Sequence, residues 1–165
     1  MTASNDPSSR IRRLETCIEG RLARLFDHDQ HAVWRMLTEP QALAQWLAPG
    51  TIEQRVGGAV HIDFADSGIT IDSAVLDFEP GRLLAYSWSS VGEPLRPLRW
   101  ALEPAGSATQ LILTVQVPLD EDGPKACAGF EAHLDMLAAA LEGVPIRFPF
   151  ERFLEARRTY QQMLA

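Results

Sequence analysis

The sequence predicts an α+β fold in which a curved antiparallel β-sheet wraps around one long helix near the C-terminus. Three observations predict it. Two short helical patterns follow a first strand, turn residues then separate a long run of strand-like segments, and an apolar-striped helix closes the domain. A bent sheet around one helix encloses a space between them, and such a space indicates a bound small molecule.

The first strand is expected at residues 17–26, where Ile18, Leu22 and Phe26 alternate imperfectly with polar residues. Asp27 and Gln30 have the spacing of a capping box, which predicts a short helix over residues 30–37. A second helix is expected after Pro40, because proline is tolerated in the first turn of a helix.

The central part of the chain is expected to form an antiparallel meander, because turn residues separate β-branched and aromatic runs every 6–14 residues. The predicted strands are residues 51–55, 59–64, 69–78, 82–89, 97–103 and 108–117. Alternation places one set of apolar side chains on the concave face. This set is Val60, Ile62, Phe64, Leu111, Leu113, Val115 and Val117.

The longest helical pattern begins at Gly123, and Gly143 can supply its left-handed C-terminal residue. Its apolar stripe is Phe130, Leu134, Leu137 and Leu141, and its expected solvated face is Glu131, Asp135 and Glu142. Residues 150–164 predict an extra helix, packed either on its own domain or on a partner subunit in a homodimer.

Length and composition indicate one globular domain, since a chain of 165 residues can bury roughly 70% of its unfolded surface. Apolar residues make up 46% and charged residues 22% of the chain. The net charge of -7 argues against a nucleic-acid partner, because phosphates are bound mainly by Lys and Arg.

The cysteines and the N-terminal residues indicate the cellular compartment of the protein. Cys17 and Cys127 form no CxxC pattern, which favours a reduced, cytoplasmic setting. Residues 1–14 lack the apolar core of a signal peptide, and we expect them to form a mobile tail. No apolar run of about 20 residues is present, so no membrane span is expected.

Eight short motifs, in this order and spacing, resemble one known family over about residues 16–143. They are Val33-Trp34, Thr38-Glu39-Pro40, Trp46, Val56-Gly57-Gly58, Glu79-Pro80-Gly81-Arg82-Leu83, Tyr86-Ser87-Trp88, Ala108-Thr109-Gln110-Leu111 and Gly129-Phe130-Glu131. The family is the activator of 90-kDa heat-shock protein ATPase homologues, in the START-like, birch-pollen-allergen-like (SRPBCC) superfamily. The resemblance implies a helix-grip fold for residues 15–143 and leaves residues 144–165 outside it. This chain departs from the family pattern at Asp29, Ser73 and Phe130, where the family favours Pro, Gly and Trp.

In a helix-grip arrangement the aromatic side chains converge on the gap between sheet and helix, where an apolar site for a small molecule can form. The candidate ligand-binding residues are Trp34, Trp46, Phe64, Trp88, Trp100, Phe130, His133, Leu134 and Leu137. The alternative is that these residues only fill the core, because aromatic side chains dominate burial.

Other chemistries have less support in the sequence. His61 and Asp63 share a strand face, but Val60 and Ile62 occupy the inner one, so a metal site is not expected. Arg99 should be exposed because it alternates with Trp100. The sequence has no Gly-x-Ser-x-Gly nucleophile elbow, no phosphate-binding loop and no Gly-x-Gly-x-x-Gly dinucleotide motif, so we name no catalytic residue and no cofactor.

The predicted function is binding of an apolar or amphipathic small molecule in the cavity between the sheet and the last long helix. One alternative is the co-chaperone role that the resemblance implies, with a heat-shock ATPase as partner. Another is an enzyme of the cyclase or hydrolase type, which needs a shielded pair of titratable groups. His133 is the one clear candidate for such chemistry, so we expect binding rather than catalysis.

Overall fold

The computed structural model describes residues 9–64 and 67–165, and its sheet begins earlier than expected. Residues 1–8 of the expected tail lie outside the described residues. The tail prediction is wrong for Arg10–Arg13, which form strand β1 and pair antiparallel with β2, Cys17–Phe26. Ile11 anchors β1 because its side chain is buried, and the Leu14 N–H donates to the Cys17 carbonyl at 2.8 Å to close the hairpin.

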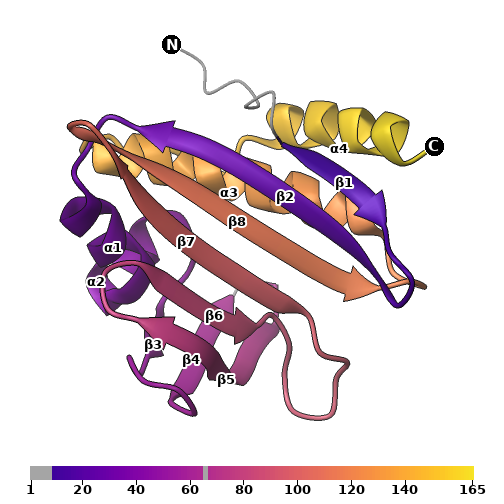
Figure 1. Cartoon of the computed structure of the whole chain (residues 1–165), viewed down its shortest axis with the longest axis horizontal. Helices are drawn as coiled ribbons and strands as arrows, with labels where there is room; N and C mark the ends of the chain where they lie inside the picture. The colour runs from indigo at the N-terminus through magenta and orange to yellow at the C-terminus, as the bar shows by residue number, and fades with distance from the viewer. Residues whose placement is uncertain (1–8, 65–66) are drawn as a thin grey trace.

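The strands of the described residues form one curved antiparallel sheet in the order β1-β2-β8-β7-β6-β5-β4-β3 (Figure 1). The meander prediction is confirmed, with β2 lying next to β8. The remaining strands are β3 Gly50–Ile52, β4 Ala59–Phe64, β5 Ile69–Glu79, β6 Leu83–Ser87, β7 Pro97–Ala105 and β8 Ala108–Pro118. The predicted inner-face residues are buried except for Phe64, which is half-buried at the end of β4.

Two short helices follow β2 as predicted, α1 at Gln30–Thr38 and α2 at Pro40–Trp46. The predicted cap at Asp27 is wrong, because the N-cap of α1 is Asp29, whose carboxylate accepts from the Ala32 N–H at 2.8 Å. The N-cap of α2 is Glu39, which makes no side-chain capping bond, while Pro40 lies in the first turn as predicted.

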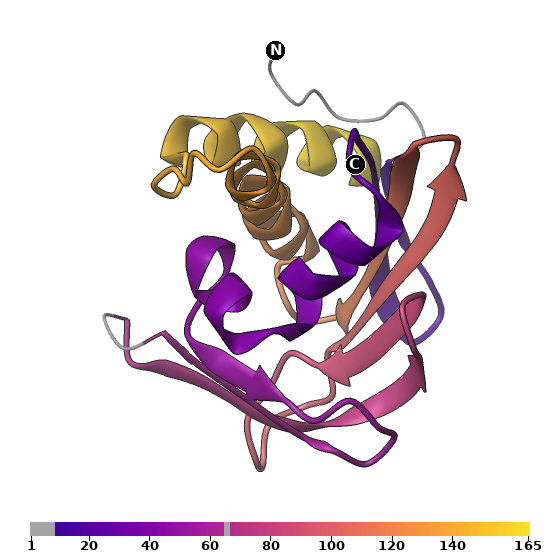
Figure 2. The same cartoon turned by 90° about the vertical axis from the view of Figure 1, so that its left-hand side faces the viewer.

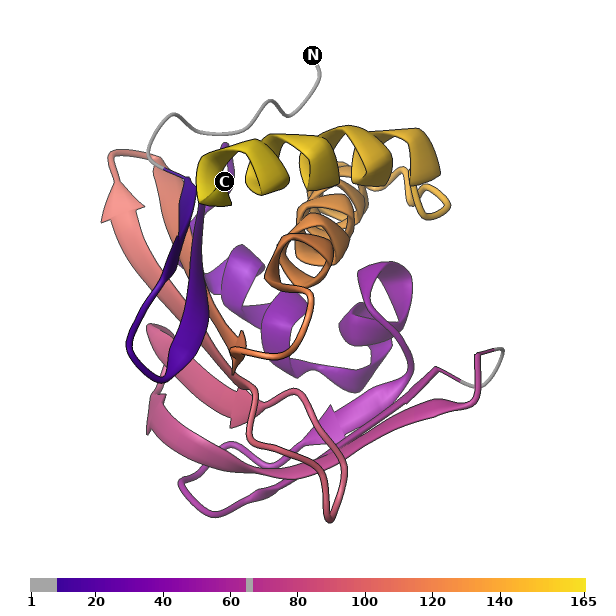
Figure 3. The same ribbon diagram turned by 90° about the vertical axis from the view of Figure 1, so that its right-hand side faces the viewer.

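The long helix α3, Gly123–Leu141, lies against the concave face of the sheet, and α4, Phe150–Leu164, crosses over it and contacts β1 (Figures 2 and 3). Gly143 has a φ of 78°, which confirms the left-handed residue expected after α3. In the described chain α4 therefore packs on its own domain. Among the described helices, none combines the length and the apolarity needed to cross a membrane.

The expected solvated face of α3 is wrong for Glu131, whose side chain is fully buried. Two neighbours cause this burial: α4 covers that face of α3, and β2 places Arg24 opposite Leu111 on the inward side of the sheet. Asp135 is mostly buried, with a side-chain exposure of 15%, whereas Glu142 is exposed as predicted.

A buried ion cluster therefore joins β2, α3 and α4. Arg24 Nη2 lies 2.7 Å from Glu131 Oε1 and 3.0 Å from Asp135 Oδ1. The Tyr160 hydroxyl donates to the second oxygen of Glu131, and Arg152 Nε lies 3.3 Å from Asp135 Oδ2. Burial raises the pKa of the Asp135 carboxyl, although Arg24 and Arg152 act in the opposite direction. The cluster fixes α4 against the core.

Candidate functional site

The structure brings five of the predicted aromatic residues into one continuous series of ring contacts, which we call the aromatic path. It runs in the order Trp46, Trp100, Phe130, Trp88 and Phe64, with ring centroids 5.7, 6.2, 5.3 and 5.7 Å apart. All four contacts are edge-to-face, the geometry that aromatic pairs favour. The path spans α2, β7, α3, the segment after β6 and β4.

Exposure rises along the aromatic path. Trp46 and Trp100 are each 1% exposed and Phe130 is 5% exposed, whereas Trp88 and Phe64 are half-buried. The path therefore connects the apolar core to the surface of the protein.

Other predicted site residues lie outside the aromatic path. Trp34 is buried on α1, and its ring contacts Phe78, with centroids 5.9 Å apart. Leu134 and Leu137 are fully buried on the α3 stripe. These three side chains belong to the surrounding core.

His133 lies at the exposed end of the aromatic path. Its ring centroid is 6.2 Å from that of Phe64 and 6.5 Å from that of Phe130. His133 Nδ1 lies 3.0 Å from the Trp46 carbonyl oxygen, at the C-terminal end of α2. Burial lowers the pKa of His133, and the hydrogen bond to Trp46 opposes this effect.

Sequence reasoning missed one aromatic residue of this region, Phe148. Its ring centroid is 5.4 Å from that of His133, its side chain is 40% exposed, and it lies between α3 and α4. It also contacts Phe153 of α4, at 5.8 Å between centroids. A single phenylalanine between two prolines shows no periodicity, so the sequence offered no signal for it.

Several buried polar atoms of the described residues have no hydrogen-bond partner, and one of them, Trp100 Nε1, lies on the aromatic path. The indole N–H of Trp100 is buried and makes no hydrogen bond to another described residue, whereas that of Trp46 donates to the Met36 carbonyl at 2.7 Å. Tyr86 lies on the same inward face of the sheet and its side chain is buried. Burial raises the pKa of the Tyr86 hydroxyl, and the nearby indole N–H of Trp100 acts in the opposite direction. The two groups are not placed to form a hydrogen bond with each other.

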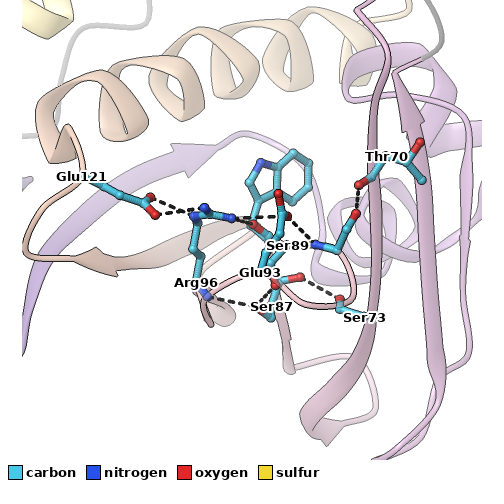
Figure 4. A network of polar contacts seen from close by, with 9 residues as sticks. Thr70, Ser73, Ser87, Ser89, Glu93, Arg96 and Glu121 are labelled. Atoms are coloured by element: carbon cyan, nitrogen blue, oxygen red, sulfur yellow. Dashed lines mark hydrogen bonds and ion pairs between the residues drawn. The ribbon is translucent and has the colours of Figure 1, made fainter.

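The loop that carries Trp88 is held by a polar network (Figure 4). Ser87 Oγ accepts from the Arg96 N–H at 2.9 Å and contacts Ser89 Oγ at 2.6 Å. The Arg96 guanidinium donates twice to the Glu121 carboxylate, at 2.8 and 2.9 Å, and the Trp88 N–H donates to the Arg96 carbonyl at 2.7 Å. The network ties this loop to the segment before α3. Sequence reasoning missed it because isolated serines form no spacing pattern.

The outer face of the sheet carries a shallow hollow of about 230 Å³, away from the aromatic path. Its lining is Asp77, Ala85, Pro97, Arg99, Thr114 and Gln116. Arg99, His61 and Asp63 are exposed, as predicted. Within residues 9–64 and 67–165, no group of three or more His, Cys, Asp or Glu side chains is arranged to hold a metal ion.

The curved antiparallel sheet, the gripped helix α3 and the aromatic interior define a protein of the helix-grip, SRPBCC-like class. The family model "Activator of Hsp90 ATPase homolog 1-like protein" matches residues 27–142, well over half of the chain. The chain therefore belongs to that family. No curated protein sequence matches it.

Solved structures agree with this assignment of the fold. The crystal structure of CalU16 from Micromonospora echinospora is 20% identical, with 97% of this chain and 98% of that chain covered and a TM-score of 0.79. A Bordetella parapertussis protein, encoded by gene BPP1335, is 26% identical over 99% of this chain and 96% of its own, with a TM-score of 0.69. DynU16, a protein in the dynemicin biosynthetic locus, is 27% identical over 77% of this chain and 48% of its own, with a TM-score of 0.67.

Proposed function

We propose that this protein binds a small apolar or amphipathic molecule between its curved sheet and α3, along the aromatic path. The observation that carries the proposal is the rise in exposure from Trp46 and Trp100 to Trp88 and Phe64. A ligand can reach apolar surface from the half-buried end without the whole core opening. Aromatic walls with a few polar groups are typical of small-molecule sites.

The polar groups favour a ligand with a hydrogen-bond acceptor, such as a carbonyl or ether oxygen. An unpartnered buried N–H costs about 1–3 kcal/mol, and a ligand oxygen at Trp100 Nε1 would remove this cost. DynU16 belongs to a biosynthetic locus, which supports a product or intermediate of biosynthesis as the ligand class.

Because neighbouring rings of the path are in contact, a ligand must displace one of them. The ring that we expect to move is Trp88, which is half-buried and follows directly after the end of β6. The polar network holds the backbone of the loop that carries Trp88, through Ser87, Arg96 and Glu121. The indole can therefore rotate while the loop stays in place.

Four tryptophans allow a direct NMR test with 1-naphthol as the probe, since each indole N–H gives its own signal. We expect saturable shifts of the Trp88 and Trp100 signals and little change at Trp34, which lies off the path. Trp88→Leu removes the ring that the ligand has to displace, so binding should tighten by up to about tenfold, equal to about 1.4 kcal/mol. Leu95→Ala, at an exposed position of the same loop, is the matched control and should leave binding unchanged. Equal shifts at all four indoles, or none, would contradict the proposal.

The second candidate function is the chaperone interaction named in the family description. The observation that favours it is a group of exposed apolar side chains around the α3–α4 junction. The group consists of Val144, Ile146, Phe148 and Phe150. A pull-down with a 90-kDa heat-shock ATPase, with Ile146→Ser as the comparison variant, tests this candidate. Capture and ATPase stimulation that Ile146→Ser abolishes would favour it over small-molecule binding.

A further inference from the structure

We propose that His133 Nε2 accepts a hydrogen bond from the ligand, and that the site thereby selects aromatic molecules that carry a hydroxyl group. This inference rests on the proposed small-molecule function and specifies its ligand class. It follows from the hydrogen bond that His133 already makes and from the groups that surround its ring.

The Trp46 carbonyl decides which nitrogen of His133 carries the proton. A carbonyl oxygen only accepts, so Nδ1, 3.0 Å away, must carry the N–H that donates to it. In the neutral imidazole the other nitrogen, Nε2, is then an acceptor. The depressed pKa of the ring favours this neutral form at pH 7.

The surroundings of His133 leave that acceptor without a protein donor. Within the described part of the chain, Nδ1 to Trp46 is the one hydrogen bond of this ring. The aromatic rings that contact it are those of Phe64, Phe130 and Phe148, which donate no hydrogen bond. A guest that pairs with Nε2 must therefore bring its own donor.

An aromatic molecule with a hydroxyl group fits this position in two ways: the hydroxyl can donate to Nε2, and the aromatic ring can pack against the phenylalanine rings. The ring of the guest can replace Trp88 against Phe64 and Phe130, both of which contact that indole edge-to-face. The hydroxyl can donate to Nε2 while remaining uncharged, so no ionised group has to enter aromatic surroundings.

The test compares two probes of nearly the same shape, 1-naphthol and 1-methoxynaphthalene, of which only the first has a donor. Calorimetric titration of the wild-type protein should show 1-naphthol binding about 3- to 10-fold more tightly, the typical range for one hydrogen bond. His133→Phe keeps a ring and removes Nε2, so the ratio should fall to about one. Loss of the bond to Trp46 affects both probes alike and cancels in this ratio.

A second readout needs no variant and keeps the test decisive if His133→Phe fails to fold. The ¹⁵N signals of His133 should show the Nδ1–H tautomer, and the Nε2 signal should move with 1-naphthol but not with 1-methoxynaphthalene. Equal affinities in the wild-type protein, or a ratio that persists in His133→Phe, would overturn the inference and leave the proposed function intact. If neither probe binds, the proposed function fails, and the inference fails with it.

Discussion

The two sides of α3 differ in the kind of contact they make. The side toward β2 and α4 holds charged and hydroxyl groups in the buried ion cluster, with Arg24, Glu131 and Tyr160 at its centre. The side toward the β6–β7 loop holds Phe130 and His133 against other rings. The side with the ion cluster is buried, and we call it the closed side of α3. The aromatic side is partly exposed to solvent.

The difference teaches where this fold can tolerate a guest. Buried charges require fixed partners, because an ion left alone in the interior loses several kcal/mol of solvation. Ring contacts are weaker and less directional, about 0.5–1.5 kcal/mol beyond their buried area. Displacing Trp88 therefore costs much less than separating Arg24 from Glu131, and the aromatic side is the one that can open.

The largest effect is expected when the ion cluster is broken. Among the described residues, Glu131→Gln leaves Arg24 with Asp135 as its one remaining charged partner, and it should lower the free energy of unfolding by about 3 kcal/mol. Urea denaturation measures this change. Glu142→Gln is the matched control, because its exposed pair with His28 is worth at most about 1 kcal/mol. Equal losses in the two variants would show that the two pairs do not differ in energy.

A smaller effect is expected at the hydroxyl of Tyr160. Tyr160→Phe keeps the ring of α4 in place and removes the donor to Glu131, so we expect a loss of about 1–3 kcal/mol. Thermal unfolding followed by circular dichroism gives the value. The affinity for 1-naphthol should not change, because Tyr160 lies on the closed side of α3. A weakened affinity would show that the two sides are coupled.

The smallest effect is a pH dependence on the aromatic side. The pKa of His133 is lowered in the folded protein, so between that pKa and about 6.5 the unfolded chain binds more protons than the folded one. Stability should therefore fall as pH drops from about 7.5 toward 5.5. In His133→Phe the free energy of unfolding should depend less steeply on pH, as measured by urea unfolding at several pH values. If the pH dependence is the same in the variant, it arises from other groups.

Most of the fold was predictable because each element carries its own periodicity. The alternation in β4 and β8 and the spacing in α3 and α4 place these elements within one or two residues of their observed bounds. Errors occurred where two elements decide the outcome together. Arg24 shares the inward parity of Ile18 and Leu22, but its burial becomes evident only when α4 is known to cover Glu131.

The candidate site was predictable in part for a similar reason. Aromatic residues stand out in a sequence, and five of them meet in the aromatic path. The contact between His133 and Trp46 joins residues 87 positions apart, and the position of Phe148 depends on how the chain turns between two helices. Neither has a local pattern. Ligand binding by these residues stays a prediction.

The placement of β2 between β1 and β8 has a consequence for biosynthesis. Cys17 pairs with Pro118 and Phe26 with Thr109, so one edge of β2 stays unpaired until β8 has been synthesised. Arg24 waits longer still, since its partner Glu131 is made 107 residues later. Pairings this distant in sequence slow folding and leave nascent strands open to aggregation. The sheet therefore cannot be completed strand by strand from its N-terminal end, because β2 must wait for β8 and Arg24 must wait for α3.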